Sequence, residues 1–296
     1  MGTPLIRQPG VAIRRVHALV NPASGGVGPG AAEALCAVLA EFGLDARVSE
    51  LEPRAAKTQM RAILDAGPDL IVVMGGDGTA GLVAGMCGPA GPLVAPLSGG
   101  TMNKLGRALY GPQPWPEALA GALKRGAARW MPGGEVDGHP FYCSAVLGPV
   151  ARLARAREAV RAHDLGRAWR LALSVSRNVL PNRLFYEFDG RTGHGLAVGL
   201  ICPTVSRALD EDEGALEAVA VRLHHARAGV RLAFSNLIGD WRDNPNVTVR
   251  PCVRGRVWAR RPLPAMLDGE FMRLGRQVEI RFRPRAFRAL APSADD

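Results

Sequence analysis

Three glycine-rich segments in the first part of the chain have residue types that could bind a phosphate. They are, in order, Asn21-Pro22-Ala23-Ser24-Gly25-Gly26, Gly75-Gly76-Asp77-Gly78-Thr79 and Ser98-Gly99-Gly100-Thr101-Met102-Asn103-Lys104. Glycines let a backbone approach a phosphate closely, and small residues at a helix N-terminus leave N–H groups open to an anion. The Asp77 carboxylate could also hold Mg²⁺, and Lys104 offers an ammonium donor. Each segment taken alone would also suit an ordinary turn.

The three segments differ from the best-known nucleotide motifs. The phosphate loop G-x-x-x-x-G-K-[ST] needs a Gly-Lys pair, and the chain has none. Residues 76–81, Gly-Asp-Gly-Thr-Ala-Gly, have the spacing G-x-G-x-x-G, but we do not expect a dinucleotide site here.

A fourth segment, Leu267-Asp268-Gly269-Glu270, lies far downstream between two β-type runs. Its two carboxylates, at positions i and i+2, could accept a proton and organise a cation. The alternative is a solvated turn, which is the more frequent role of a carboxylate pair in such a place.

The elements that must position the glycine segments follow from an alternation of strand and helix patterns. Strand-like runs occur at 15–20, 47–51, 70–73 and 93–96, and each is followed by apolar residues at helical spacing. This alternation predicts a parallel α/β sheet. Ligands of such sheets bind at the carboxyl ends of the strands, so we expect the three glycine segments to gather there.

The pattern changes after about residue 130, where β-type runs separated by turn residues replace the alternation. We predict an antiparallel sandwich or barrel from runs at 184–188, 196–201, 216–223, 247–249, 256–259 and 278–282.

Length, composition and net charge limit the number of domains and the kinds of partner that we expect. With 296 residues, 47% hydrophobic and 22% charged, the chain is expected to fold into two globular domains. The net charge of +10 favours anionic partners, although a general bias toward arginine would also produce it. Nucleic acid is not expected as a partner, because aromatic residues make up 5% and no binding module is recognisable.

Cysteine usage and hydropathy indicate a cytoplasmic protein. The five cysteines are widely spaced without metal-ligand pairing, which predicts buried thiols in a reducing compartment and no zinc site. No apolar run approaches the ~20 residues that span a bilayer, and residues 1–20 lack the apolar core of a signal peptide.

Taken together and in this order, four motifs resemble those of the diacylglycerol kinase catalytic-domain family. They are Asn-Pro-x-Ser-Gly, Gly-Gly-Asp-Gly-Thr, Gly-Thr-x-Asn and a late Asp-Gly-Glu, and the likeness is nearest to soluble bacterial lipid kinases related to the sphingosine kinases. The resemblance covers nearly the whole chain. Gly-Gly-Asp-Gly-Thr also occurs in NAD kinases, and the other three motifs narrow the choice.

The resemblance implies an architecture in two parts. A Rossmann-like α/β domain of the NAD kinase/diacylglycerol kinase type would occupy 11–132, and 284–296 is a candidate segment to complete it. An antiparallel β-sandwich domain for the lipid would follow at 133–283, with a helical insert at about 150–180. ATP and the lipid would meet in the cleft between the domains.

The resemblance also implies an activity: transfer of the γ-phosphoryl group of ATP, with Mg²⁺, to a hydroxyl of diacylglycerol or a related lipid alcohol. Asp268 would be the general base that takes the proton from the lipid hydroxyl. Glu270 would orient this hydroxyl or help to bind a cation. Asp77 and, in an acidic stretch at 210–213, Asp212 are candidate metal ligands. The implied nucleotide-binding residues are Asn21, Ser24, Gly75, Gly76, Asp77, Gly78, Thr79, Gly100, Thr101, Asn103 and Lys104.

Two positions depart from the family pattern. Members usually have Asn-Glu shortly after Gly-Gly-Asp-Gly-Thr, where this chain has Gly81-Leu82, and Asp at the position of Lys104. Lys104 reverses a charge beside the expected phosphates, which puts the metal arrangement and the rate in question. One rival interpretation is therefore a nucleotide- or lipid-binding protein that has lost transfer activity, and a second is an NAD kinase-like enzyme.

A lipid substrate would require peripheral contact with a membrane surface. The arginine-rich segment 151–177 could dock there, or it could be an ordinary helix pair packed on the sandwich. The sequence leaves the specific lipid and a homodimer open.

Overall fold

The computed structural model describes residues 6–8, 11–152, 183–206, 208–209, 214–222 and 245–292. The chain divides into two compact units, one of Met1–Pro132 with Pro284–Asp296 and one of Gly133–Arg283. Nearly all of the expected helical insert, and the acidic stretch with Asp212, lie outside the described residues. The docking helix expected at 151–177 falls there too, apart from its first residues.

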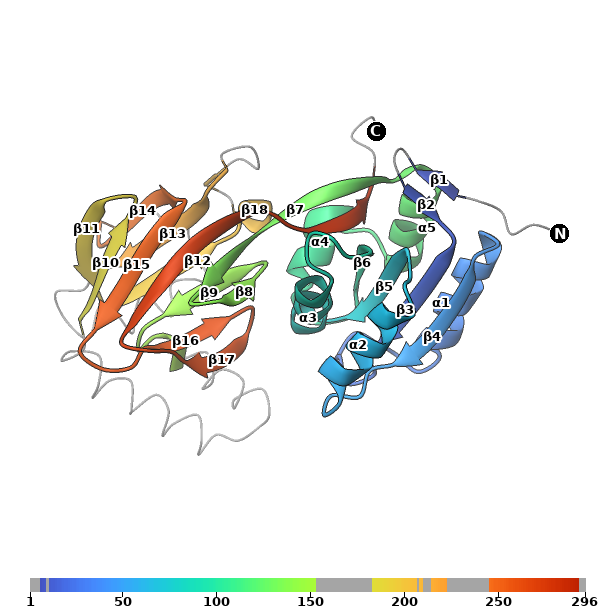
Figure 1. Ribbon diagram of the computed structural model, residues 1–296, viewed down its shortest axis with the longest axis horizontal. Helices are drawn as coiled ribbons and strands as arrows, with labels where there is room; N and C mark the ends of the chain where they lie inside the picture. The colour runs from blue at the N-terminus through green and yellow to red at the C-terminus, as the bar shows by residue number, and fades with distance from the viewer. Residues whose placement is uncertain are drawn as a thin grey trace. The chain divides into compact units, whose positions relative to one another are not determined.

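The first unit is built on a parallel sheet with the strand order β4-β3-β5-β6, to which the end of β18 adds a further parallel strand (Figure 1). All six residues of β5 are buried, as the unbroken apolar run predicted. The strands are β3 (Arg15–Val20), β4 (Asp45–Glu50), β5 (Leu70–Gly75), β6 (Leu93–Ser98) and β18 (Gln277–Ala291), and β1 (Ile6–Gln8) pairs with β2 (Val11–Ile13).

Helices fill the connections between these strands. Right-handed crossovers place α1 on one face of the sheet and α2 and α3 on the other, since β3 to β4 and β4 to β5 run in opposite directions across it. In agreement with this, α1 contacts α5, whereas α3 contacts α2 and α4. The helices are α1 (Ala31–Glu41), α2 (Ala56–Asp65), α3 (Asp77–Cys87), α4 (Lys104–Tyr110) and α5 (Trp115–Arg125).

The second unit contains two antiparallel sheets. One has the order β14-β13-β12-β9-β16-β17, and the other contains β11-β10-β15-β18, with β7 paired to β18 and β8 paired to β7. The strands are β7 (Ala127–Val136), β8 (His139–Phe141), β9 (Ser144–Leu147), β10 (Leu184–Phe188), β11 (Arg191–Gly195), β12 (Ala197–Ile201), β13 (Leu216–Val221), β14 (Val247–Cys252), β15 (Arg254–Ala259), β16 (Pro264–Leu267) and β17 (Glu270–Arg273). A 3-10 turn, Pro203–Val205, follows β12.

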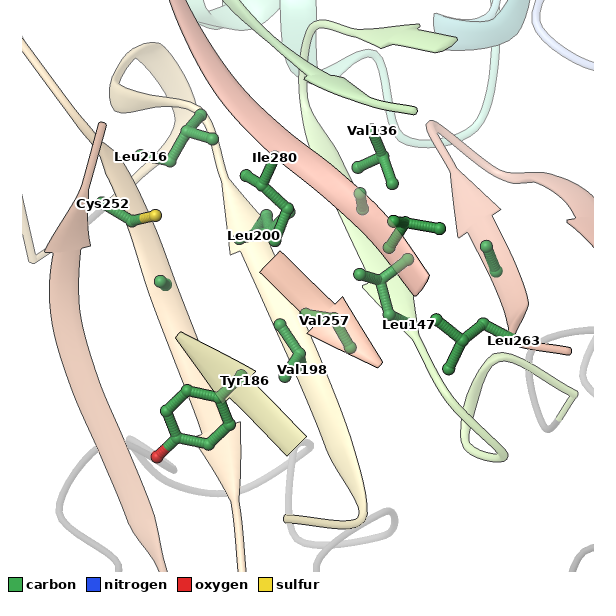
Figure 2. Packing of buried hydrophobic residues seen from close by; sticks show 14 of the residues in the cluster. Val136, Leu147, Tyr186, Val198, Leu200, Leu216, Cys252, Val257, Leu263 and Ile280 are labelled. Carbon is green, nitrogen blue, oxygen red and sulfur yellow. The ribbon is translucent and has the colours of Figure 1, made fainter. Parts of the chain in front are cut away.

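A single apolar core joins the two sheets of this unit (Figure 2). Leu147, Val198 and Leu200 come from the first sheet, and Val257 and Ile280 come from the second. This packing makes the unit a sandwich, and the predicted fold class, an α/β domain with an antiparallel β-sandwich domain, is confirmed.

Three Asp-Gly turns close hairpins in the sandwich. They are Asp137-Gly138, Asp189-Gly190 and Asp268-Gly269, and every one of these residues has a positive φ. Two successive positive φ angles define the type I′ turn, whose twist matches that of the strands that it joins.

Within the described part of the chain, no helix is long and apolar enough to cross a bilayer.

Candidate active site

The three glycine-rich loops lie together at the carboxyl edge of the parallel sheet, as predicted. The Asn21 N–H donates to the Met74 carbonyl at 2.8 Å, which joins the end of β3 to the end of β5. The Gly99 N–H donates to the Gly75 carbonyl at 3.0 Å, and the Gly26 N–H donates to the Gly99 carbonyl at 3.0 Å. Backbone hydrogen bonds therefore connect all three loops to one another.

Polar side chains tie the same loops together. Asn21 Nδ2 donates to Thr79 Oγ1 at 2.8 Å, and Ser24 Oγ accepts from the Gly76 N–H at 3.2 Å. Three residues that the sequence placed at a nucleotide, Asn21, Ser24 and Thr79, thus hold the first two loops in register.

Asn103 does the same within the third loop. Its Oδ1 accepts from the Gly100 N–H at 2.6 Å, and its Nδ2 donates to the Gly100 carbonyl at 2.8 Å. Asn103 has φ = 50°, a left-handed conformation that asparagine tolerates better than most residues. It stands immediately before α4 and sets the turn that begins this helix.

The glycines of the loops fall into two groups. A Cβ on Gly100 would lie 2.5 Å from Gly76 Cα, and a Cβ on Gly99 would lie 2.8 Å from the Gly75 nitrogen, so these positions need glycine because the loops touch. A Cβ on Gly25 or Gly78 would meet nothing within 4 Å. Neither of these two has a positive φ, so packing and backbone strain do not account for them.

Asp77 is the first residue of α3, and one of its oxygens also serves the start of α4. Its Oδ1 accepts from the Leu105 N–H at 3.1 Å. Lys104, half-buried, is the first residue of α4, whereas Thr101 is exposed. The loops thus present one carboxylate and one ammonium group at two neighbouring helix N-termini.

A carboxylate cluster for a metal is not found in the described residues, where no three His, Cys, Asp or Glu side chains come together. Mg²⁺ needs no such cluster when it binds through one or two carboxylates, several waters and substrate phosphates. Asp77, the only carboxylate in the three loops, is compatible with that mode of binding.

Asp268 belongs to the second unit, where three consecutive backbone N–H groups hold its carboxylate. Oδ2 accepts from Tyr142 at 2.6 Å, and Oδ1 accepts from Cys143 and from Ser144, each at 2.8 Å. The Asp268 N–H donates to the Ser144 carbonyl at 2.9 Å.

The buried thiol of Cys202 lies near the Asp268 carboxylate. Burial is the main cause that raises the pKa of this thiol well above its usual value, and the negative charge of Asp268 is the second cause.

Asp189 shows that this arrangement has a structural use. Its carboxylate accepts from the Val253 and Arg254 N–H groups, each at 2.9 Å, and its own N–H donates to the Arg254 carbonyl at 2.9 Å. Both residues open an Asp-Gly hairpin and clamp it to a neighbouring segment. The sequence contained the Asp-Gly signal for these turns, but not the partners, which lie 64 to 126 residues away.

Glu270 is exposed and begins β17, where it is paired in register with Leu267 of β16. Asp268 is half-buried in the turn between these strands. The two predicted carboxylates therefore have different environments.

Residues 15–136 match the model of the diacylglycerol kinase catalytic domain. The resemblance inferred from the motifs is thereby confirmed, and the match contains all three glycine-rich loops. Asp268 and Glu270 lie outside the matched residues.

Solved structures resemble the chain over nearly its whole length. A diacylglycerol kinase from Bacillus anthracis str. Sterne is 17% identical, has a TM-score of 0.65, and aligns over 95% of this chain and 98% of its own. An NAD kinase from Archaeoglobus fulgidus in complex with ATP is 12% identical, with a TM-score of 0.53 and 94% coverage of both chains. At these identities the likeness shows a shared fold. Among curated proteins, none matches the sequence.

Two surface hollows lie away from the loops of the catalytic domain. One, of about 360 Å³, is lined by charged residues of β10, β15 and β18, including Glu187, Arg254 and Arg281. The other, of about 350 Å³, lies beside α1 and β4 and is lined by residues including Cys36 and Ser49. Neither hollow is lined by a residue of the predicted site.

Proposed function

We propose that the protein is an ATP-dependent lipid kinase that transfers the γ-phosphoryl group to a hydroxyl of diacylglycerol or a related lipid alcohol. The observation that carries the proposal is the set of three glycine loops that are joined by hydrogen bonds. All three lie inside residues 15–136, which match the model of the diacylglycerol kinase catalytic domain.

The nucleotide phosphates are assigned to the open side of these loops. Gly25 and Gly78 leave space that no protein atom fills within 4 Å of an added Cβ, and a phosphate can use that space. The first N–H groups of α3 have no acceptor within the helix, and the helix dipole favours an anion there. Lys104 adds a point charge at the start of α4.

Mg²⁺ would be held by Asp77 together with the phosphates, and it would neutralise part of their charge. One Asp77 oxygen is engaged by the Leu105 N–H, which fixes the orientation of the carboxylate. Lys104 would share the task of neutralising charge from the neighbouring helix N-terminus.

In the proposed transfer step, the lipid hydroxyl gives its proton to the Asp268 carboxylate as its oxygen attacks the γ-phosphorus. The bond between the γ-phosphorus and the bridging β,γ-oxygen breaks, and ADP leaves. The three N–H groups that hold Asp268 would fix the position of the base, and the exposed Glu270 would orient the hydroxyl. Phosphoryl transfer requires mainly positioning and charge neutralisation, which these groups can supply.

A binding protein without transfer activity is the second candidate, and the structure offers a specific observation for it. Two of the described carboxylates that are proposed for chemistry already accept backbone hydrogen bonds, Asp77 from one N–H and Asp268 from three. Such a protein would bind ATP but release no ADP with any acceptor.

Acceptor-dependent release of ADP tests the proposal. The chain is incubated with ATP and Mg²⁺, and ADP is measured with diacylglycerol, with sphingosine, with NAD and without acceptor. Release that requires a lipid alcohol supports the lipid kinase. Release that requires NAD would replace it with an NAD kinase-like activity, and ATP binding without release would favour the binding protein.

A further inference from the structure

The strand β4 forms one edge of the parallel sheet in the first unit (Figure 1), and among the described strands it pairs with β3 alone. The Leu51 N–H, just beyond β4, donates to the Val20 carbonyl of β3 at 2.7 Å. Every second residue of a parallel strand directs its backbone groups to its neighbour. Ala46, Val48 and Glu50 therefore direct theirs away from β3. We call this outward row of backbone groups the free edge of β4.

The middle of the free edge has backbone groups available to a further strand. At its end, the Glu50 carbonyl accepts from Gln59 Nε2 at 2.6 Å, as its outward direction requires. Ala46 and Val48 are half-buried, and their outward N–H and C=O groups have no hydrogen-bond partner among the residues that the structure describes. An open edge of this kind is a template for pairing with another chain.

Two exposed charged side chains, Asp45 and Arg47, flank Ala46 on the strand. Within the described part of the chain, neither side chain forms an ion pair or a hydrogen bond. Arg15 of β3 is in register with Asp45, but its guanidinium is directed to Asp69, with Nη2 3.8 Å from Oδ1. The two charges, of opposite sign, are therefore available to a partner.

His17 of β3 is the titratable neighbour of Arg47. The two residues are in register, and His17 Nε2 lies 2.8 Å from Ser49 Oγ. Burial, and next the charge of Arg47, lower the pKa of His17, so its imidazole adds no positive charge near neutral pH. Arg47 is the one cation that β4 contributes to this edge.

We propose that the free edge of β4 pairs antiparallel with the same edge of a second copy of this chain. A two-fold axis at Ala46 makes the pairing self-complementary, because Asp45 of each copy then stands opposite Arg47 of the other. The two Ala46 residues would exchange both backbone hydrogen bonds, and each Val48 N–H would donate to the Leu44 carbonyl of the other copy. Asp45 and Arg47 would form the adjoining pair without backbone hydrogen bonds, in which side chains are closest and opposite charges stabilise the strands.

The charges favour this register over the next one that the free edge allows. An axis at Val48 would also align outward backbone groups, but it would set Arg47 opposite Ser49 and leave Asp45 without an opposite charge. Since a shift in register changes every cross-strand pair, the two charged side chains distinguish the two arrangements.

The hollow of about 350 Å³ beside α1 lies along the same edge, where Cys36 and Val48 are among the residues that line it. In the proposed pairing Val48 stands opposite Leu44 of the second copy, so the chain of that copy would pass beside the hollow. Glu33 and Glu50 also line the hollow. Glu50 is about 13 Å along the strand from the two-fold axis, so these acidic residues of the two copies stay apart.

Sedimentation velocity of the full chain over a series of concentrations tests the pairing. The wild type should form a dimer reversibly. Arg47→Asp should weaken dimerisation at least about tenfold, because both matched pairs become like-charged, and Asp45→Arg should do the same. The double variant Asp45→Arg/Arg47→Asp should return to within about threefold of the wild type, since it restores both pairs. Arg191→Asp is the control, because it reverses an exposed arginine on β11, an edge strand of the sandwich, and should dimerise like the wild type.

A wild type that remains monomeric at about 100 μM would overturn the proposal. Dimerisation that neither single substitution weakens would place the interface elsewhere, and a double variant that unfolds in urea like the wild type but does not recover would refute the charge pairing. Stronger association of the single variants would show that Asp45 and Arg47 protect the edge from pairing, which is the opposite of the proposal. None of these results depends on the proposed kinase activity.

Discussion

Asp268 has a structural role that is visible in its hydrogen bonds and a proposed chemical role, and a substitution can separate the two. In Asp268→Asn one carboxylate oxygen becomes an amide nitrogen, which cannot accept from the N–H groups of Tyr142, Cys143 or Ser144. Leaving one of these groups unsatisfied should cost about 1–3 kcal/mol of unfolding free energy. Phosphoryl transfer should be lost as well. Urea unfolding and ADP release measure the two effects.

Asp189→Asn is the control for this variant, since Asp189 occupies an equivalent turn and accepts two backbone N–H groups. It should lose a similar amount of stability and keep its transfer activity at a temperature where both variants are folded. If Asp189→Asn and Asp268→Asn lost activity equally, the effect at Asp268 would be structural, and its role as a base would be refuted.

Lys104 stands at the first position of α4, where we place a phosphate. Lys104→Asp should lower ATP affinity at low Mg²⁺ and shift the Mg²⁺ titration of activity, because a positive charge near the phosphates becomes negative. Lys57→Asp is the control, as Lys57 is exposed in the first turn of α2. Superimposable Mg²⁺ titrations of the two variants would argue against any contact between Lys104 and phosphate.

At the scale of the elements, Gly78 of helix α3 allows stability and ATP binding to be tested separately. Gly78 lies in its first turn, where an added Cβ meets no protein atom. Gly78→Ala should leave the unfolding free energy unchanged or raise it by up to about 1 kcal/mol, since alanine favours helix. ATP affinity should fall, because the methyl group occupies space assigned to a phosphate. Isothermal titration with ATP and urea unfolding give both quantities.

Gly121→Ala in α5 is the matched control, since an added Cβ there also meets nothing within 4 Å. It should share the stability effect without the loss of affinity. Gly100→Ala behaves differently, because its Cβ would lie 2.5 Å from Gly76 Cα and force the loops apart. Unchanged ATP affinity in Gly78→Ala would contradict the placement of a phosphate at the N-terminus of α3.

The sequence predicted the elements of the α/β unit well because their signals are local. The strand at 15–20 has the predicted bounds, and the buried run at 70–73 lies within β5. In the sandwich, 184–188 is β10 as predicted, but β7, β9 and the short strands β8, β11, β16 and β17 were not anticipated. For all of these except β9, an adjoining Asp-Gly turn was the available signal.

The rest could not be predicted because it depends on long-range pairing. The run predicted at 278–282 is part of β18, a strand of 15 residues whose end pairs with β6 through Ala289 and Val94. The hydrogen bonds between Asp268 and residues 142–144 likewise cross more than 120 positions. Composition and spacing indicate that such residues are polar and lie in a turn, but they do not identify the partner strand.

At the scale of the whole molecule, burial inside each unit predicts how the five cysteines react with a thiol reagent. Cys36 is exposed, and Cys87, Cys143, Cys202 and Cys252 are buried. Burial raises the pKa of Cys87 and of Cys252 to about 12, so both remain protonated and unreactive near neutral pH. A thiol reagent should modify about one cysteine per native chain rapidly and all five after unfolding. Rapid reaction of several thiols in the native protein would contradict the packing of both cores.

The most direct test of the lipid kinase follows the phosphoryl group itself. ATP labelled at the γ-phosphorus and ATP labelled at the α-phosphorus are incubated separately with the chain, Mg²⁺ and vesicles that contain diacylglycerol and sphingosine. Label should enter the lipid fraction from the γ-position and not from the α-position. Absence of γ-label in every lipid, while the same preparation binds ATP, would contradict the proposed transfer.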